Sequence, residues 1–488
     1  MRGLRGIADS RFGRRYLGNR EFYRVVLALV VPIVIQNTIT NFVSLLDNIM
    51  VGAVSTEQMS GVSIANQLVF VYNLCIFGGM SVSSIFAAQY YGAKDEQGIR
   101  YSFRYAMYVA LVVGAAAIFV LGFFRGGLIS RFINDVEATG GADETFQAAD
   151  GYVLVMIFGL LPFAVSQAYA GILRVVGESK LPMIASVTSV LVNLLFNYLL
   201  IFGKCGFPAM QAKGAAIATV ISRYVEMLII VLVSHRRLRR AGMYGFLRGA
   251  YRSLRIPGAL LRQIFAKGLP LLANEALWSS GMTCLNQQYS LRGLNVVAAL
   301  TVTTTITNLF NTFYLSMGTA ASVMVGRALG AGDEEESRAC ARKIIFFDLL
   351  LCLAIELIMF VSAPALPRIY LETGDAVRGI ARDMIRVYAL AAPLIGFANC
   401  AYFILRAGGR TGITFLFDCG FTWVVPLPVV AALVHFTDLG IIPIYAVYHA
   451  TDFVKDVLGY ILMKKGIWIQ NIVSALKQES ENETVELI

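Results

Sequence analysis

Long apolar runs restrict the fold of this sequence more than any other feature. Several of them approach or exceed the ~18–20 residues that a helix needs to cross the hydrocarbon core of a bilayer. They do not alternate apolar and polar residues, as barrel strands do. Because backbone groups in lipid must be paired within their own segment, we expect transmembrane helices. The composition agrees, since only 15% of the residues are charged, against roughly 25% in soluble domains.

The runs predict an all-α integral membrane protein with about twelve transmembrane helices in two pseudo-symmetric six-helix bundles. The helices are expected near 25–50, 62–89, 103–123, 148–173, 181–203, 214–234, 266–290, 296–325, 343–364, 382–405, 412–434 and 440–463. The domains are then a basic N-terminal arm at 1–24, a bundle at 25–234, a basic linker at 235–265, a second bundle at 266–463 and a tail at 464–488.

The distribution of basic residues predicts the orientation. With both termini on the cytoplasmic side, 30 of the 41 Lys and Arg residues lie on that side and 8 on the outer side. This bias follows the positive-inside rule. We therefore expect a multi-pass protein of the cell (inner) membrane with its termini and linker in the cytoplasm. The net charge of +10 is interpreted as a topology signal and a contact for anionic membrane lipids, not as a nucleic-acid site.

Two internal repeats relate the halves. Residues 86–96 (FAAQYYGAKDE) align with residues 324–334 (MVGRALGAGDE) at an offset of 238, which Pro32 and Pro270 share. Residues 172–177 (ILRVVG) align with 404–409 (ILRAGG) at an offset of 232. Six helices per half give both halves the same orientation, so we expect an axis along the membrane normal and a substrate path between or within the halves.

Metal and enzyme chemistry find little support in the sequence. The seven cysteines are scattered without CxxC spacing, and there are only three histidines. Motifs of the DDxxD, HExxH and GxSxG types and a nucleotide-binding glycine loop do not occur in the sequence. We therefore predict a protein that is not an enzyme and has no cofactor, with no metal beyond a possible Na⁺ at Asp47.

The first helix carries a polar stripe. At ~100° per residue, Asn37, Asn41, Ser44 and Asn48 share one face, and Thr40 and Asp47 extend it. A carboxylate within a span costs roughly 2.5–3.5 kcal/mol on insertion scales, so Asp47 is a candidate ion or proton site. The alternatives are a buried structural hydrogen bond or a helix-end acid at the outer surface.

The fifth and sixth helices add polar groups to the first half. Asn193 and Asn197 share a face with two serines, and their amide oxygens would suit Na⁺ if Asp47 supplied the charge. The alternative is hydrogen bonding between helices. In the sixth helix, Arg223 and Glu226 are three residues apart, and we predict a structural ion pair in preference to a substrate site.

The second half offers a further substrate or coupling site. Glu275 shares a face with Ser279 and Asn286. The alternatives for it are attraction of a cationic substrate, binding of a second proton, or the role of a partnered structural acid. A polar stripe in the eighth helix is a candidate cavity wall: Thr301, Thr304, Thr305, Asn308 and Thr312. In the last helix one face holds Tyr445, Tyr448, His449, Asp452, Lys455 and Asp456. There Lys455 is expected to neutralise Asp452 or Asp456. The whole face is then a proton relay, a cation subsite or a network that fixes the fold. Asp348 and Glu356 are further acids within the ninth helix.

The order and spacing of several motifs resemble those of the multidrug and toxic compound extrusion (MATE) family over essentially the whole chain. The motifs are Pro32 with residues 47–52 (DNIMVG), residues 65–67 (ANQ), 89–93 (QYYGA) and 173–177 (LRVVG), and Asn193 with Asn197, Tyr198 and residues 201–203 (IFG). The resemblance implies secondary active efflux of small organic compounds, usually cations, driven by Na⁺ or H⁺ as the coupling ion.

Within that family the chain looks closest to the DinF-like branch, whose first helix has a proline and an aspartate spaced as Pro32 and Asp47 are. The resemblance makes Asp47 the cation- or proton-binding carboxylate. The polar faces of the helices add Asn41, Asn193 and Asn197 to this predicted site. Asn197 stands where that branch can have a second acid. Glu275 lies about one turn nearer Pro270 than the glutamate of the NorM-type branch.

Two other functions compete with efflux. A flippase for a lipid-linked saccharide, from the same broad superfamily, would need basic residues in its cavity, whereas embedded acids outnumber embedded bases here. A channel is disfavoured by a long 6+6 repeat without an evident re-entrant filter. No obligate protein partner is indicated, and a monomer is expected.

Overall fold

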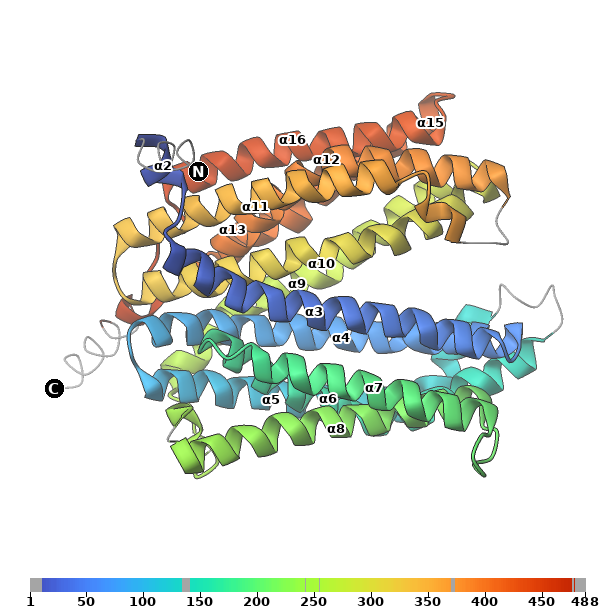
Figure 1. Cartoon of the computed structure of the whole chain (residues 1–488), viewed down its shortest axis with the longest axis horizontal. Coiled ribbons are helices and arrows are strands. Elements are labelled where there is room, and N and C mark those ends of the chain that lie inside the picture. The colour runs from blue at the N-terminus through green and yellow to red at the C-terminus, as the bar shows by residue number, and fades with distance from the viewer. Residues whose placement is uncertain are drawn as a thin grey trace. The chain divides into compact units, whose positions relative to one another are not determined.

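The computed structural model describes residues 11–133, 141–241, 243–253, 255–369, 374–475 and 478; the side chains of 11, 12, 14, 43–49, 133 and 241 lie outside this description. All regular structure in these ranges is helical. The described ranges contain the twelve expected long helices (Figure 1). Eleven are α3 (Arg20–Gly52), α4 (Thr56–Gly92), α5 (Glu96–Ile133), α6 (Ala142–Val175), α7 (Lys180–Phe202), α8 (Gln211–Ala241), α9 (Gly258–Ser290), α10 (Leu294–Gly330), α11 (Glu334–Ser362), α12 (Asp375–Ala407) and α16 (Ile441–Lys465).

The remaining long helix is irregular. It consists of α13 (Thr411–Phe415), a π-helical turn η4 (Leu416–Gly420), α14 (Phe421–Val424) and α15 (Pro426–Phe436). Because proline has no N–H to donate, Pro426 separates α14 from α15. Short helices complete the fold: α2 (Arg11–Tyr16), η2 (Gly245–Leu247) and η3 (Leu366–Ile369).

Most helices extend beyond the apolar runs that predicted them, because polar residues continue the helix at their ends. The helix α11 shows the reason. It begins at Glu334, although apolar residues alone predict a start near residue 343. Asp333 is its N-cap and accepts a hydrogen bond of 2.8 Å from the backbone N–H of Glu336. Three glutamates follow in the first turn, where negative charge favours the helix dipole.

The chain forms two compact units. The N-terminal unit comprises residues 31–87 and 95–261, and the C-terminal unit comprises residues 1–30, 88–94 and 262–488. The junction at Leu261 and Arg262 falls within the predicted linker. The C-terminal unit also includes the start of α3 and the end of α4, which the proposed division at 235–265 does not anticipate.

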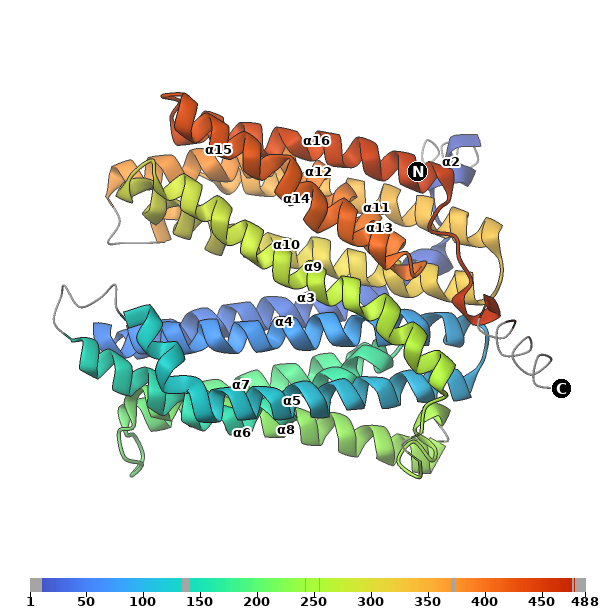
Figure 2. The same ribbon diagram turned by 180° about the vertical axis from the view of Figure 1, so that it is seen from behind.

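Each unit has its own apolar core. In the N-terminal unit α6 packs against α5 and α8, and α7 packs against α8 (Figure 2). Small residues such as Ala149, Ala164 and Ala216 are fully buried and permit close packing of these helices. In the C-terminal unit α12 packs against α10, α11 and α16 (Figure 1), around buried residues that include Met384 and Ile385.

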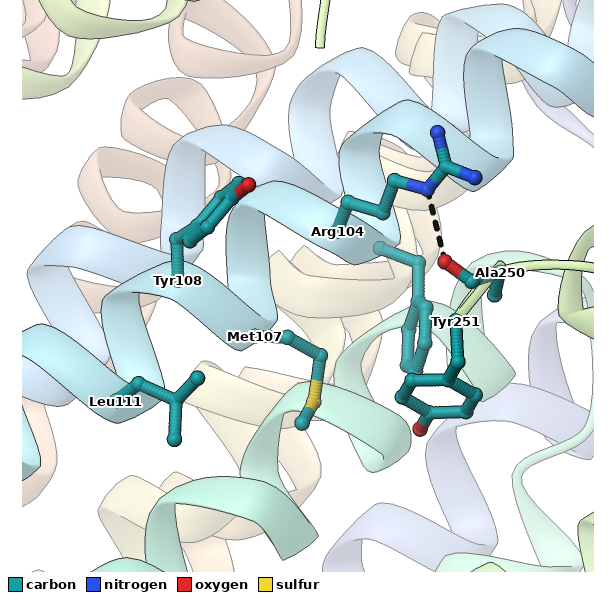
Figure 3. Close-up of a pocket in the computed structure, with 7 residues that line it drawn as sticks. Arg104, Met107, Tyr108, Leu111, Ala250 and Tyr251 are labelled. Atoms are coloured by element: carbon teal, nitrogen blue, oxygen red, sulfur yellow. Dashed lines mark hydrogen bonds between the residues drawn. The ribbon is translucent and has the colours of Figure 1, made fainter. Parts of the chain in front are cut away.

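The linker docks on α5 through a buried arginine. Arg104 donates hydrogen bonds to the carbonyls of Gly249 (3.1 Å), Ala250 (2.9 Å) and Arg255 (2.9 Å). Figure 3 shows Arg104 reaching Ala250 beside a small cavity. Its lining is Phe103, Arg104, Met107, Tyr108, Leu111, Ala250 and Tyr251. The guanidinium group therefore donates its hydrogen bonds to linker carbonyls and not to a ligand.

Candidate functional site

The polarity of two helices marks the candidate site. Among the described helices, ten are long and apolar enough to cross a membrane by length and composition. The long helices α9 and α16 do not reach that apolarity. They carry the acids predicted for the second half, Glu275 on α9 and Asp452 and Asp456 on α16. Embedded polar groups of this kind are costly and are typical of functional sites.

The centre of this site is Asp418, in the π-helical turn η4. Its Oδ1 lies 2.8 Å from Nζ of Lys455 on α16. Its Oδ2 accepts a hydrogen bond of 3.0 Å from Nδ2 of Asn274 on α9. Asn274 also accepts one of 3.3 Å from the backbone N–H of Cys419, so it holds both the carboxylate and the turn that carries it. Such π turns occur frequently at functional sites.

Tyr402 on α12 links Asn274 to two charged residues, Glu275 and Arg406. Its hydroxyl lies 3.5 Å from Oε1 of Glu275 and 3.4 Å from Nδ2 of Asn274. Nη1 of Arg406 donates to the same hydroxyl at 3.4 Å. These hydrogen bonds are at the long end of the usual range, so they are weak. Glu275 and Arg406 therefore both contact the hydroxyl of Tyr402.

The α16 face is aromatic and acidic. Nδ1 of His449 lies 3.2 Å from Oδ2 of Asp452. The rings of Tyr445 and Tyr448 pack on His449 with centroid distances of 4.7 and 4.8 Å. Oδ1 of Asp456 is buried and has no hydrogen-bond partner in the described structure. We name these residues, together with Asn274, Glu275, Tyr402, Arg406, Asp418 and Lys455, the C-unit network.

The C-unit network corrects one sequence prediction. The direct partner of Lys455 is Asp418, and not Asp452 or Asp456 of its own helix. Lys455 therefore joins two helices. The charges of Asp452 and Asp456 also act on it. With four carboxylates against Lys455 and Arg406, the network has an excess of negative charge and favours a cation or a proton over an anion.

The N-terminal unit brings Asn193 and Asn197 together on α7. Nδ2 of Asn197 donates to Oδ1 of Asn193 at 3.1 Å, and Nδ2 of Asn193 donates to Oγ1 of Thr219 on α8 at 3.2 Å. Both asparagines are buried. Asn41 lies on α3 and is exposed. Asp47 is also on α3, but its side chain lies outside the described structure.

Arg223 and Glu226 lie in a basic environment on α8. Glu226 is buried, and the charges of Arg223 and Arg174 both act on it. Arg223 stands over the ring of Phe163, 4.9 Å from its centroid. Arg174 donates a hydrogen bond of 3.0 Å to Gln36. Among the described ion pairs, none joins Arg223 to Glu226 within 4.0 Å, so their attraction acts over a longer distance.

Asn286 and Asn308 lie outside the hydrogen bonds that hold the C-unit network. Asn286 is exposed on α9. Asn308 is exposed on α10 and accepts a hydrogen bond of 3.3 Å from Nδ2 of Asn311. Asn311 in turn accepts a hydrogen bond from the hydroxyl of Tyr388 on α12. Asn308 is therefore tied to α12 through a short polar chain.

The MatE family model matches residues 32–199 and 270–429, more than half of the chain. The chain belongs to the MatE family. The two matched segments begin at Pro32 and Pro270, the prolines that the internal repeat relates. Neither segment includes α8 or α16, so the family match does not by itself assign a role to Arg223, Glu226 or the charged face of α16.

Two curated relatives cover most of the chain. The chain is 22% identical to "Probable multidrug resistance protein NorM" of Thermotoga maritima, over 94% of this chain and 96% of that protein. It is 24% identical to "Probable multidrug resistance protein YoeA" of Bacillus subtilis, over 90% and 92% of the two chains.

Two solved structures share the fold. "Crystal structure of MATE in complex with MaL6" has a TM-score of 0.79 at 22% identity, covering 94% of this chain and 97% of that chain. A structure titled "Reverse polarity of binding pocket suggests different function of a MOP superfamily transporter from Pyrococcus furiosus" also has a TM-score of 0.79, at 22% identity, covering 93% and 97%.

Four members of this MatE protein's C-unit network were missed by sequence reasoning: Asn274, Tyr402, Arg406 and Asp418. A signal existed for two of them. Arg406 aligns with Arg174 at the offset of 232, and Asn274 aligns with Gln36 at the offset of 238. Since Arg174 donates to Gln36, the repeat could have directed attention to both. Tyr402 and Asp418 carried no comparable signal, although Asp418 interrupts an apolar run.

Proposed function

We propose that this protein is a secondary active efflux transporter that exports small organic, cationic compounds in exchange for Na⁺ or H⁺. Membership of MatE, a transporter family, supports transport. The observation that carries the choice of substrate class is the excess of carboxylates over basic groups in the C-unit network. Glu275, Asp452 and Asp456 have no lysine or arginine within 4.0 Å among the described ion pairs, so they attract a cation.

We propose that Asp47 supplies the charge of the coupling-ion site, with Asn41, Asn193 and Asn197 as neutral oxygen ligands. Hard oxygen donors suit Na⁺, and the same carboxylate could instead take a proton. The buried pair of Asn193 and Asn197 supports this proposal, because its hydrogen bonds hold the amide groups in fixed orientations. Binding of the coupling ion at Asp47 and binding of the organic cation in the C-unit network then disfavour each other.

Negative coupling between the two cation sites explains exchange in physical terms. If binding of the inward-moving cation lowers the affinity for the organic cation, thermodynamic linkage requires the reverse effect of equal size. Binding of the coupling ion therefore promotes release of the organic cation, and the reverse. In the C-unit network the Asp418–Lys455 pair holds η4 against α16, while Glu275, Asp452 and Asp456 remain for the transported or coupling cation.

We propose a location in the cell membrane, with both termini and the linker in the cytoplasm and the protein acting as a monomer. The bias of 30 inner to 8 outer basic residues supports the orientation.

A saccharide flippase is less well supported than efflux. Lys455 is engaged by Asp418, and Arg406 donates to Tyr402. Neither is available as a free cation for a pyrophosphate. Transport of a lipid-linked pyrophosphate without any organic-cation transport would favour the flippase.

The test is transport by purified protein in proteoliposomes with separately imposed Na⁺ and H⁺ gradients. A lipophilic cationic dye serves as substrate, and an anionic dye of similar size serves as its control. We expect gradient-dependent movement of the cationic dye alone. Movement that persists at the same rate without either gradient would contradict exchange.

A further inference from the structure

A second embedded acid lies away from the C-unit network. Asp348, on α11, is 1% exposed. Among the described ion pairs, none involves Asp348, so no lysine, arginine or histidine nitrogen lies within 4.0 Å of its carboxylate. Its hydrogen-bond partner is the thiol of Cys352, one turn further along the helix, which lies 3.9 Å from Oδ1. A thiol is a weak donor and does not compensate a buried negative charge.

The groups of α10 and α12 that the described structure places beside Asp348 are neutral. On α12, Gly396 lies directly against this pair: a Cβ there would overlap Sγ of Cys352 and lie 3.4 Å from Oδ2 of Asp348. The thiol of Cys400, one turn later on α12, interacts electrostatically with Asp348. On α10, Tyr314 does so too, and its buried hydroxyl has no hydrogen-bond partner in the described structure.

The other groups near α11 are acidic, neutral or directed elsewhere. Glu356, two turns beyond Asp348 on α11, interacts with Tyr314. The helix α2 and the start of α3 pack against Phe346 and Phe347 through Tyr16 and Tyr23. Lys343 stands over the ring of Phe22 at 5.9 Å. None of these described neighbours places a positive charge beside the carboxylate of Asp348.

The packing around Asp348 favours a proton over a metal ion as its ligand. A sodium or divalent ion needs several oxygen ligands around it. Here the described contacts are the thiol of Cys352 and, against that thiol, Gly396, where a Cβ would overlap Sγ. A proton needs no such shell, because it binds to the carboxylate oxygen itself.

We propose that Asp348 is a proton-binding site in the C-terminal unit, separate from the C-unit network, and that it exchanges its proton with solvent when α11 and α12 part at Gly396. The neutral acid fits this site, where Gly396 packs against Cys352. The ionised acid requires water or a cation, and the described contacts supply neither. Proton release and separation of the two helices are therefore linked. The site itself does not depend on the proposed function, but a role for it in transport does.

Infrared spectroscopy of the purified full-length protein in lipid nanodiscs tests this site. Protonated carboxyl groups and S–H groups absorb in spectral regions that are clear of the backbone bands. We expect a carboxyl band that disappears in Asp348→Asn. As the pH is raised, the wild-type band should decrease while the S–H band assigned by Cys352→Ala shifts at the same pH, because an ionised acceptor strengthens the thiol hydrogen bond.

Two controls fix the assignment. Asp383→Asn removes a carboxylate that is paired with Arg382 at 2.8 Å and should leave the carboxyl band unchanged. Cys75→Ala removes a thiol of the N-terminal unit and should leave the pH-dependent S–H band in place. If Asp348→Asn does not fold, the wild-type and Cys352→Ala spectra still decide the question.

Two results would overturn the proposal. Identical carboxyl bands in wild type and Asp348→Asn would mean that the acid is always ionised. A band that is lost in the variant but constant across acidic and alkaline pH would mean a fixed structural proton. Absence of dye transport by the wild-type protein would refute the proposed function without affecting either spectroscopic result.

Discussion

Gly92 and Gly330 occupy reciprocal positions where the ends of α4 and α10 cross in the C-terminal unit. A Cβ on Gly92 would overlap the carbonyl oxygen of Arg327, and a Cβ on Gly330 would overlap that of Gln89. The two glycines align at the repeat offset of 238, and so do Gln89 and Arg327. The repeated motif is thus a close helix crossing that each copy makes with the other. Glycine is required here for backbone approach, since neither position has a positive φ.

The crossing predicts that Gly330→Ala destabilises the protein. Inserting a methyl group into a packed contact costs about 1–3 kcal/mol, because the helices must move apart. Gly122→Ala on α5 is the matched control, since a Cβ there meets nothing within 4 Å and the change should stabilise the helix by roughly 0.5–1 kcal/mol. Thermal unfolding in detergent measures both. Equal melting temperatures for the two variants would contradict the close crossing.

The Asp418–Lys455 pair predicts unequal effects of single and double substitutions. Lys455→Met leaves Asp418 without its cation and should cost up to about 3 kcal/mol, because one partner of a largely buried ion pair is removed. Adding Asp418→Asn should restore part of that loss, because no charge then remains unpaired. The control is Arg125→Met, whose ion pair with Asp150 at 2.7 Å is more exposed and should be worth ~1 kcal/mol or less.

The readout of this comparison is the unfolding temperature of each variant, analysed as a double-mutant cycle. Additive losses at Asp418 and Lys455 would show that the two side chains do not stabilise each other. In that case Asn274 alone would have to hold the π turn.

The sequence was sufficient to predict the number and order of the long helices, because apolar runs respond directly to the thickness of the bilayer. It predicted their ends less well. The polar first turn of α11 lies outside the apolar run but is held by Asp333 and the helix dipole. The irregular turn η4 was not predicted, since hydrophobic periodicity does not distinguish a π turn from an α-helical one.

The candidate site was only partly predictable for a similar reason. Embedded charges can be recognised in a sequence, and Glu275, Asp452, Lys455 and Asp456 were. Their partners depend on how helices are rotated about their axes. The choice of Asp418 by Lys455 therefore follows from the packing of η4 against α16, and spacing within α16 suggested the wrong acid.

The proposed orientation predicts opposite labelling of two cysteines. Cys205 is exposed, in the segment between α7 and α8 that is expected on the outer side. A membrane-impermeant maleimide should label it in intact cells. Arg248→Cys places a thiol at an exposed linker position and, with Cys205 replaced by serine, should be labelled only after lysis. Gly245 would be a poor choice for this test, because a Cβ there meets the carboxylate of Glu96. Ready labelling at residue 248 in intact cells would reverse the orientation.

The coupling role proposed for Asp47 predicts that Asp47→Asn abolishes gradient-driven dye transport. Asparagine keeps the size and polarity of the side chain but removes the charge that Na⁺ or H⁺ would neutralise. Insertion and folding should be unchanged, since a neutral residue costs less within a span than a carboxylate. Uptake into proteoliposomes under an imposed gradient should fall at least about tenfold, the effect of losing roughly 1.4 kcal/mol of coupling free energy. Asp150→Asn, at the half-buried ion pair with Arg125, is the control and should transport normally.

A wild-type rate in the purified Asp47→Asn variant would make Asp47 structural. The coupling site would then have to lie at Glu275 or on α16, where Asp452 and Asp456 have no basic partner other than His449 among the described ion pairs.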